Sequence, residues 1–160
     1  MSAFFDQLLA ELSEKLEIPL SQDGNGACLL VMRSGLKIQL EMTNSPMRLL
    51  FSCKLGALPR GSTRLILMRE ALKWNCLDIP ATGFITYYPP DNQLVLQHLV
   101  PMEEVNADFV FDFLDVFEQK ASLWVEAVSV GYPPDLPQNP LPDERVANQG
   151  IFGGLKPFGR

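Results

Sequence analysis

The hydrophobic and polar positions of this chain follow two different periods, and the changes of period mark the expected elements. Across residues 2–16, apolar side chains recur every three or four positions, which predicts an amphipathic helix. Segments 27–33, 36–42 and 47–55 favour strands, and the second alternates between apolar and polar at every position. Together they predict a three-stranded meander with one apolar face. Such a sheet needs a helix packed on that face, and the first helix can provide it.

The second half of the chain predicts a further helix, a hairpin and a long helix. Apolar residues of segment 62–75 spread around much of the helix, so this helix is expected to be buried on more than one side. Strands are expected at 83–88 and 93–100. The second is expected to end at residue 100 because Pro101 has no amide hydrogen to continue the ladder. A long aromatic-rich helix follows at about 106–128. The order α-β-β-β-α-β-β-α predicts an α+β fold, and residues 83–128 carry more apolar surface than one hairpin and one helix can hide alone.

The pattern ends near Val130. Six of the 13 prolines lie beyond that residue, which favours an extended tail. We therefore expect one folded domain at 1–130 and a proline-rich C-terminal tail at 131–160. The last ten residues, 151–160, hold two Phe-Gly pairs and two cations. They are typical either of a docking peptide or of a disordered end.

Composition and charge narrow the class of protein. The net charge of −6 and the pI near 4.7 disfavour nucleic acid and anionic membranes as partners. No apolar run reaches the roughly 20 residues of a membrane span, and the first residues lack the pattern of a signal peptide. Cys28, Cys53 and Cys76 fall in apolar stretches and are too few and too far apart for a zinc site. An odd number of cysteines with no apparent pairing favours a reducing compartment, the cytosol.

Candidate chemistry is sparse. His98 is the only histidine, and the sequence offers it no recognisable catalytic partner, so a structural role is favoured. Asp108, Asp112 and Asp115, with Glu118 close by, could gather a cation or a basic partner, but a solvated helix face is favoured. Nucleotide-binding glycine motifs are absent. The sequence therefore predicts no catalytic, cofactor-binding or metal-binding residues, and no enzyme.

The return strand and the segment after it carry a family resemblance. Gln93–Val100 ends in an apolar residue followed by Pro101, then an acidic link at Met102–Glu104, then the long helix. With the element order, the small size and the low pI, this resembles the class I type III secretion chaperones, the Tir chaperone (CesT) family. The resemblance covers about Phe4 to Val128, and the proline-rich tail departs from it.

The resemblance implies a compact homodimer in the bacterial cytoplasm, built from a twisted antiparallel sheet and helices. Such a protein binds the extended N-terminal chaperone-binding segment of one or more virulence effectors and keeps it soluble and competent for secretion, without a cofactor. Components of the export apparatus are further candidate partners. Two alternatives are a small α+β ligand-binding or enzymatic domain using His98, and a chaperone-like adaptor or regulator unrelated to export.

Two sets of apolar residues are the expected binding surfaces. The two-sided second helix and the first hairpin strand are expected to form the dimer interface, through Leu65, Met68, Leu72, Trp74, Phe84 and Tyr87. Exposed parts of the first helix and the meander are expected to bind the effector, through Phe4, Phe5, Leu8, Leu29, Val31 and Leu50. Alternation places the last three on the sheet face away from the core, where the long third helix is an alternative cover.

Overall fold

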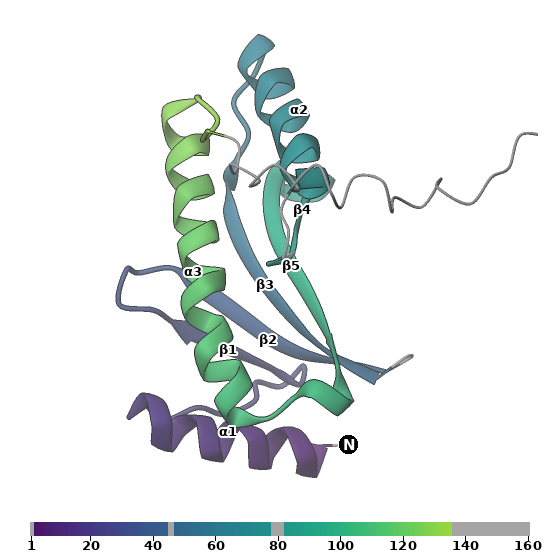
Figure 1. The fold of residues 1–160 in the computed structure, drawn as a ribbon, viewed down its shortest axis with the longest axis vertical. Helices are drawn as coiled ribbons and strands as arrows, with labels where there is room; N and C mark the ends of the chain where they lie inside the picture. The colour runs from purple at the N-terminus through teal and green to yellow at the C-terminus, as the bar shows by residue number, and fades with distance from the viewer. Residues whose placement is uncertain (1, 45–46, 78–81, 136–160) are drawn as a thin grey trace, which may run out of the picture.

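A computed structural model describes residues 2–44, 47–77 and 82–135. The chain folds as the predicted α+β order of elements (Figure 1). The elements are α1 (Ser2–Leu16), β1 (Ala27–Val31), β2 (Lys37–Asn44), β3 (Met47–Ala57), α2 (Ser62–Leu77), β4 (Phe84–Tyr88), β5 (Gln93–Pro101) and α3 (Ala107–Val130), with short 3-10 helices at Pro89–Asp91 and Met102–Glu104.

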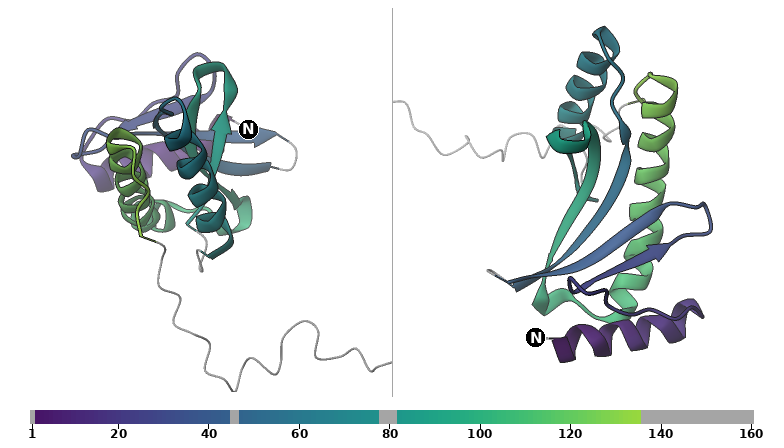
Figure 2. Two further views of the ribbon diagram at one scale, coloured as in Figure 1. Left: turned by 90° about the horizontal axis from the view of Figure 1, so that it is seen from above. Right: turned by 180° about the vertical axis from the view of Figure 1, so that it is seen from behind.

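The strands form one antiparallel sheet in the order β1-β2-β3-β5-β4, which leaves β1 and β4 as its edges. The long helix α3 lies along one face of this strongly twisted sheet, α1 crosses its foot, and α2 lies beside β4 (Figures 1 and 2). The first strand is shorter than predicted, because Met32 and Leu36 already close the turn that follows it, with a 2.8 Å bond from the Met32 N–H to the Leu36 carbonyl.

The core lies between the sheet and α3. Leu49, Phe51 and Cys53 alternate along β3 and are buried, and the Phe51 ring packs edge-on against Phe113 of α3 at 5.0 Å. The first helix completes this core with one apolar stripe. Its buried residues are Phe5, Leu8, Leu9 and Leu12.

Helix α3 begins and ends with regular caps. The Asn106 side chain accepts a bond from the Phe109 N–H, which satisfies one of the free amides of the first turn. At the other end, Gly131 adopts a left-handed conformation with φ 75°, and its amide bonds the Ala127 carbonyl. The helix therefore runs two residues beyond the predicted Val128.

A buried lysine joins α3 to the start of β4. Lys120 is only 4% exposed, and its ammonium donates a 2.7 Å hydrogen bond to the Gly83 carbonyl. Gly83 has φ 97°, and a Cβ built there would lie 2.5 Å from the Gln97 carbonyl oxygen. Only glycine fits this close approach of β4 to β5, and Lys120 holds the same residue from the helix side.

His98 lies on the core face of β5, stacked on the Phe113 ring at 4.6 Å. Partial burial, followed by the nearby charge of Lys120, lowers the pKa of the imidazole below its usual 6.5, while Glu104 acts in the opposite direction. The favoured structural role agrees with this packing among aromatic rings.

The lowered pKa of His98 predicts a pH dependence of stability. Because the unfolded histidine binds a proton more readily than the folded one, its contribution is complete above pH 6.5 and is lost as the pH falls through the lower folded pKa. Urea unfolding measured from about pH 7.5 to about pH 5 should show the wild-type chain losing stability relative to His98→Gln. Parallel pH profiles of the two proteins would contradict this assignment.

Candidate protein-binding site

One face of the sheet is left uncovered by the helices, and we call it the open face. It carries Leu29 and Val31 of β1, which are 55% and 58% exposed, and the half-buried Leu50 of β3. The alternative that α3 covers these residues is wrong, because α3 packs on the opposite face, against Phe51. Strand alternation therefore assigned these three side chains to the correct face.

A groove of about 950 Å³ crosses the open face. Its lining mixes apolar and polar side chains from all five strands, including Leu29, Gln39, Glu41, Lys54, Tyr88 and Val95. Amides and both signs of charge beside apolar side chains can bind polypeptide backbone and mixed side chains alike. The groove is therefore suited to an extended peptide.

The outer edge of β1 offers free main-chain groups beside this groove. Along two antiparallel strands, hydrogen-bonded residue pairs alternate with pairs that are not hydrogen-bonded. Because the Met32 N–H bonds the Leu36 carbonyl, this parity makes Leu30 and Ile38 a hydrogen-bonded pair of β1 and β2. By the same parity, the amide and carbonyl groups of Leu29 and Val31 point away from β2. In the described part of the chain, the edge is closed at the start of the strand, where the Asp23 N–H donates to the Ala27 carbonyl and the Asp23 carboxylate accepts from the Ala27 N–H. An added strand has room to pair along β1.

The opposite edge, at β4, is closed by a side chain. The Asn75 carboxamide of α2 accepts a 2.8 Å bond from the Ile85 N–H and donates a 2.9 Å bond to the Ile85 carbonyl. It thus takes the place of a neighbouring strand's peptide group. Sequence reasoning missed this residue, although an asparagine in the last turn of a helix that directly precedes a strand was an available signal.

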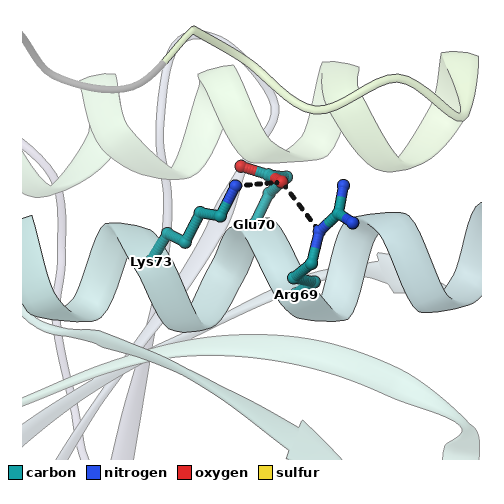
Figure 3. A network of polar contacts seen from close by, with 3 residues as sticks. All are labelled: Arg69, Glu70 and Lys73. Atoms are coloured by element: carbon teal, nitrogen blue, oxygen red, sulfur yellow. Dashed lines mark hydrogen bonds and ion pairs between the residues drawn. The ribbon is translucent and has the colours of Figure 1, made fainter.

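A second apolar surface lies on α2. Leu65 and Leu72, seven residues apart, are 68% and 66% exposed, and Met68 between them is half-buried. On another side of the same helix, Glu70 forms ion pairs with Arg69 at 3.1 Å and Lys73 at 2.9 Å (Figure 3). The hydrogen bond from Lys73, together with that from Arg69, lowers the pKa of the Glu70 carboxyl. The surface of α2 is thus divided into an exposed apolar stripe and an ionic side, in which Glu70 is largely covered.

Trp74 does not belong to the surface expected to form the dimer interface. It is 6% exposed and packs edge-on against Trp124 of α3, so its ring belongs to the core of one chain. Phe84 is 44% exposed and lies on the open face at β4, where a partner can reach it. Tyr87 is half-buried and receives a 2.8 Å bond from Arg64.

Phe5 and Leu8 do not belong to the surface expected to bind the effector. Their side chains are 1% and 3% exposed and belong to the stripe of α1 that packs into the core. Phe4 is 45% exposed and is the member of the α1 set that a partner can reach. A helix turns by 100° per residue, so neighbouring phenylalanines face different environments.

The cysteines and acids do not form a metal site in the described part of the chain, where no cluster of three ligating side chains is found. Cys28 and Cys53 are buried, and burial raises the pKa of both thiols, that of Cys53 to about 11. Cys76 is exposed, unlike the other two cysteines. Across residues 2–44, 47–77 and 82–135, every helix is too short or too polar to cross a membrane.

Comparison with protein families matches residues 7–124 to the Tir chaperone protein (CesT) family. The chain belongs to this family. The match spans α1 to the last turns of α3 and confirms the resemblance carried by the strand, the proline and the acidic link. A comparison with curated protein sequences found no match.

Solved structures confirm the CesT-type α+β fold. A chain of the HopA1-SchA chaperone-effector complex is 20% identical, with a TM-score of 0.65, covering 79% of this chain and 96% of that one. A chain of the ExsC-ExsE complex is 17% identical, with a TM-score of 0.63, covering 80% and 96%. A chain of the heterodimeric ExoU-SpcU complex from the type III secretion system of Pseudomonas aeruginosa is 18% identical, with a TM-score of 0.61, covering 77% and 98%.

Proposed function

We propose that this protein is a type III secretion chaperone that binds an extended N-terminal segment of a secreted effector across the open face. Membership of the CesT family carries the class of function. The groove across the open face, with exposed apolar side chains at its β1 end, supports the mode of binding. The chaperone acts in the cytoplasm by binding alone, without catalysis.

The arrangement of edges favours β1 as the strand to which an effector segment adds. Main-chain bonds from Leu29 and Val31 would supply affinity, because each outward group exchanges water for a peptide partner. Side chains of the added strand would alternate between the open face and the core side of the sheet. Asn75 already occupies the corresponding groups of β4, so that edge is a poorer acceptor.

The protein purified from its native host tests this proposal. We expect it to retain a secreted protein, and limited proteolysis of the complex should leave a protected fragment from that protein's N-terminal region. Mass spectrometry of the retained material identifies the fragment. Recovery of metabolites alone, with no bound polypeptide, would point to a small-molecule-binding domain and overturn the proposal.

Substitution of the β1 side chains tests the surface itself. The double variant Leu29→Asp/Val31→Asp should weaken binding of that effector fragment by at least about 100-fold, because two apolar contacts worth roughly 1.5–3 kcal/mol each are replaced by charge. Isothermal titration calorimetry measures this loss. Phe111→Asp, an exposed aromatic on α3, is the matched control and should bind as the wild type does. Equal binding by the double variant would exclude this part of the open face.

We further propose a homodimer joined through the apolar stripe of α2, formed by Leu65, Met68 and Leu72, together with Phe84 of β4. Large exposed apolar side chains gathered on one helix favour contact with a second copy, because association removes them from water. The folded domain is proposed to end near residue 130. The tail at 131–160 then lies outside the unit that dimerises and binds effector.

A further inference from the structure

The outward surface of α3 carries an apolar track that neither the sheet nor the other helices cover. Val116, Leu123 and Val130 are spaced by seven residues and therefore lie along one side of the helix. They are 46%, 48% and 66% exposed. The proposed effector site and the proposed dimer interface use none of these residues, so the track calls for a different occupant.

Acidic side chains border the apolar track. Residues three or four positions apart lie on the same side of a helix. Asp112 lies four positions before Val116, Asp115 lies four positions before Gln119, and Glu126 lies three positions after Leu123. All three acids are exposed, and within the described residues they form no ion pair, unlike Asp108, which binds Lys15 at 2.5 Å. The track is therefore an apolar line beside a row of negative charge.

The chain itself begins to run back over this track. After Gly131 it reverses direction, visible at the upper end of α3 in Figure 1, and the Tyr132 N–H bonds back to the Ala127 carbonyl at 3.1 Å. A hollow of about 240 Å³ lies between Leu123 and Val130 on α3 and residues 132–135 after it. A second hollow of about 490 Å³ shares Leu123 and Glu126 and continues towards Asp115. Residues 132–135 thus lie beside the C-terminal end of the track.

We propose that this track on α3 binds the chain's own C-terminal segment, residues 151–160. That segment combines apolar residues with cations, Ile151, Phe152, Leu155, Lys156, Phe158 and Arg160, which complement an apolar line bordered by acids. The fifteen residues 136–150 can span up to about 50 Å, whereas α3 is about 36 Å long. The segment can therefore reach every part of the track.

Two physical arguments favour this occupant over others. A second copy of the same surface would place acids against acids in a symmetric contact, which is repulsive. A segment on the same chain acts at an effective concentration on the order of millimolar, so it competes well against a separate basic protein of similar affinity. The consequence is that the tail shields the outward side of α3 and leaves the open face free.

Zero-length carbodiimide coupling in the full chain tests the proposal, because it joins only amines and carboxyls in direct contact. We expect peptide mass spectrometry to find Lys156 joined to Asp112, Asp115 or Glu126. The Lys54–Asp91 ion pair, at 3.0 Å, is the internal positive control. Leu123→Asp should reduce the Lys156 products about tenfold, whereas Ser129→Asp, which adds the same charge to an exposed position of α3 outside both hollows, should leave them.

The outcomes separate the possible occupants. Mixing isotopically heavy and light chains shows whether each product joins one chain or two. Products within one chain that depend on Leu123 support the proposal. Products that join a heavy chain to a light chain would show that the track binds a second copy. If the Lys54–Asp91 product forms but no Lys156 product does, the track binds another protein. Either result overturns the proposal. Effector binding on the open face is independent of all three.

Discussion

Leu72→Asp should convert the proposed dimer into a soluble monomer. In a symmetric interface each substitution acts twice, so two buried leucine contacts are lost and two carboxylates meet an apolar surface. The loss of about 3–6 kcal/mol corresponds to a dissociation constant raised by roughly 100-fold to 10,000-fold. Because Leu72 is 66% exposed in the single chain, the fold itself does not need this side chain. Gel filtration with light scattering measures the mass.

The control for this experiment is Phe111→Asp, which places the same charge at an exposed apolar residue of α3, outside the proposed interface and outside the apolar track. It should remain dimeric. An intact soluble dimer of Leu72→Asp would remove the α2 stripe from the interface, and a strictly monomeric wild-type protein would count against the homodimer itself. Thermal unfolding of both variants shows whether either change damages the fold.

Strand positions were predicted well from the sequence because their periodicity is unambiguous. Alternation fixed the two faces of β2 and β3, and it correctly placed Leu50 away from the core. Pro101 marked the end of β5 because proline lacks the amide that the ladder uses. Both rules are local, because a strand's faces and its end depend on the residues of that strand alone.

Helix faces were predicted less well because their environment depends on distant partners. Helix α2 presents apolar residues on more than one side, and its periodicity does not say which side is buried. Helix α1 has one apolar stripe, and its periodicity does not say whether that stripe meets the sheet or a partner. Phe5 and Leu8 are buried because α1 crosses the foot of the sheet against α3, and Trp74 is buried because Trp124 lies opposite it. Such pairings join residues far apart in sequence, and no local pattern contains them.

Lys120 carries a signal in the sequence that the predictions above did not use. It falls on the core stripe of α3, between the buried Phe117 and Trp124 at helical spacing. A lysine at such a position must find a partner, since burying an ammonium without one is costly. Here the partner is the Gly83 carbonyl, and the Trp74 ring lies 6.0 Å from the ammonium. The sequence indicated a buried cation, but only the fold identifies what it binds.

Replacement of Lys120 is expected to be the most destabilising single change considered. Lys120→Ala should lower the free energy of unfolding by about 3 kcal/mol, because it leaves the buried Gly83 carbonyl without this donor and opens a cavity under Trp74. Lys120→Met keeps most of the volume and removes the donor, so it should cost only about 1–2 kcal/mol. Urea unfolding of the three proteins at one pH measures both differences.

The comparison between the two variants separates hydrogen bonding from packing. Removing a buried ammonium also relieves its desolvation, and this gain partly offsets the lost bond in both proteins. If Lys120→Met is as stable as the wild type, the bond to Gly83 contributes nothing net and the lysine acts through its hydrocarbon stem. If it is less stable, the bond holds β4 against α3. Phe84, the next residue of β4, then depends on Lys120 for its place in the proposed dimer interface, and the methionine variant should also dimerise more weakly.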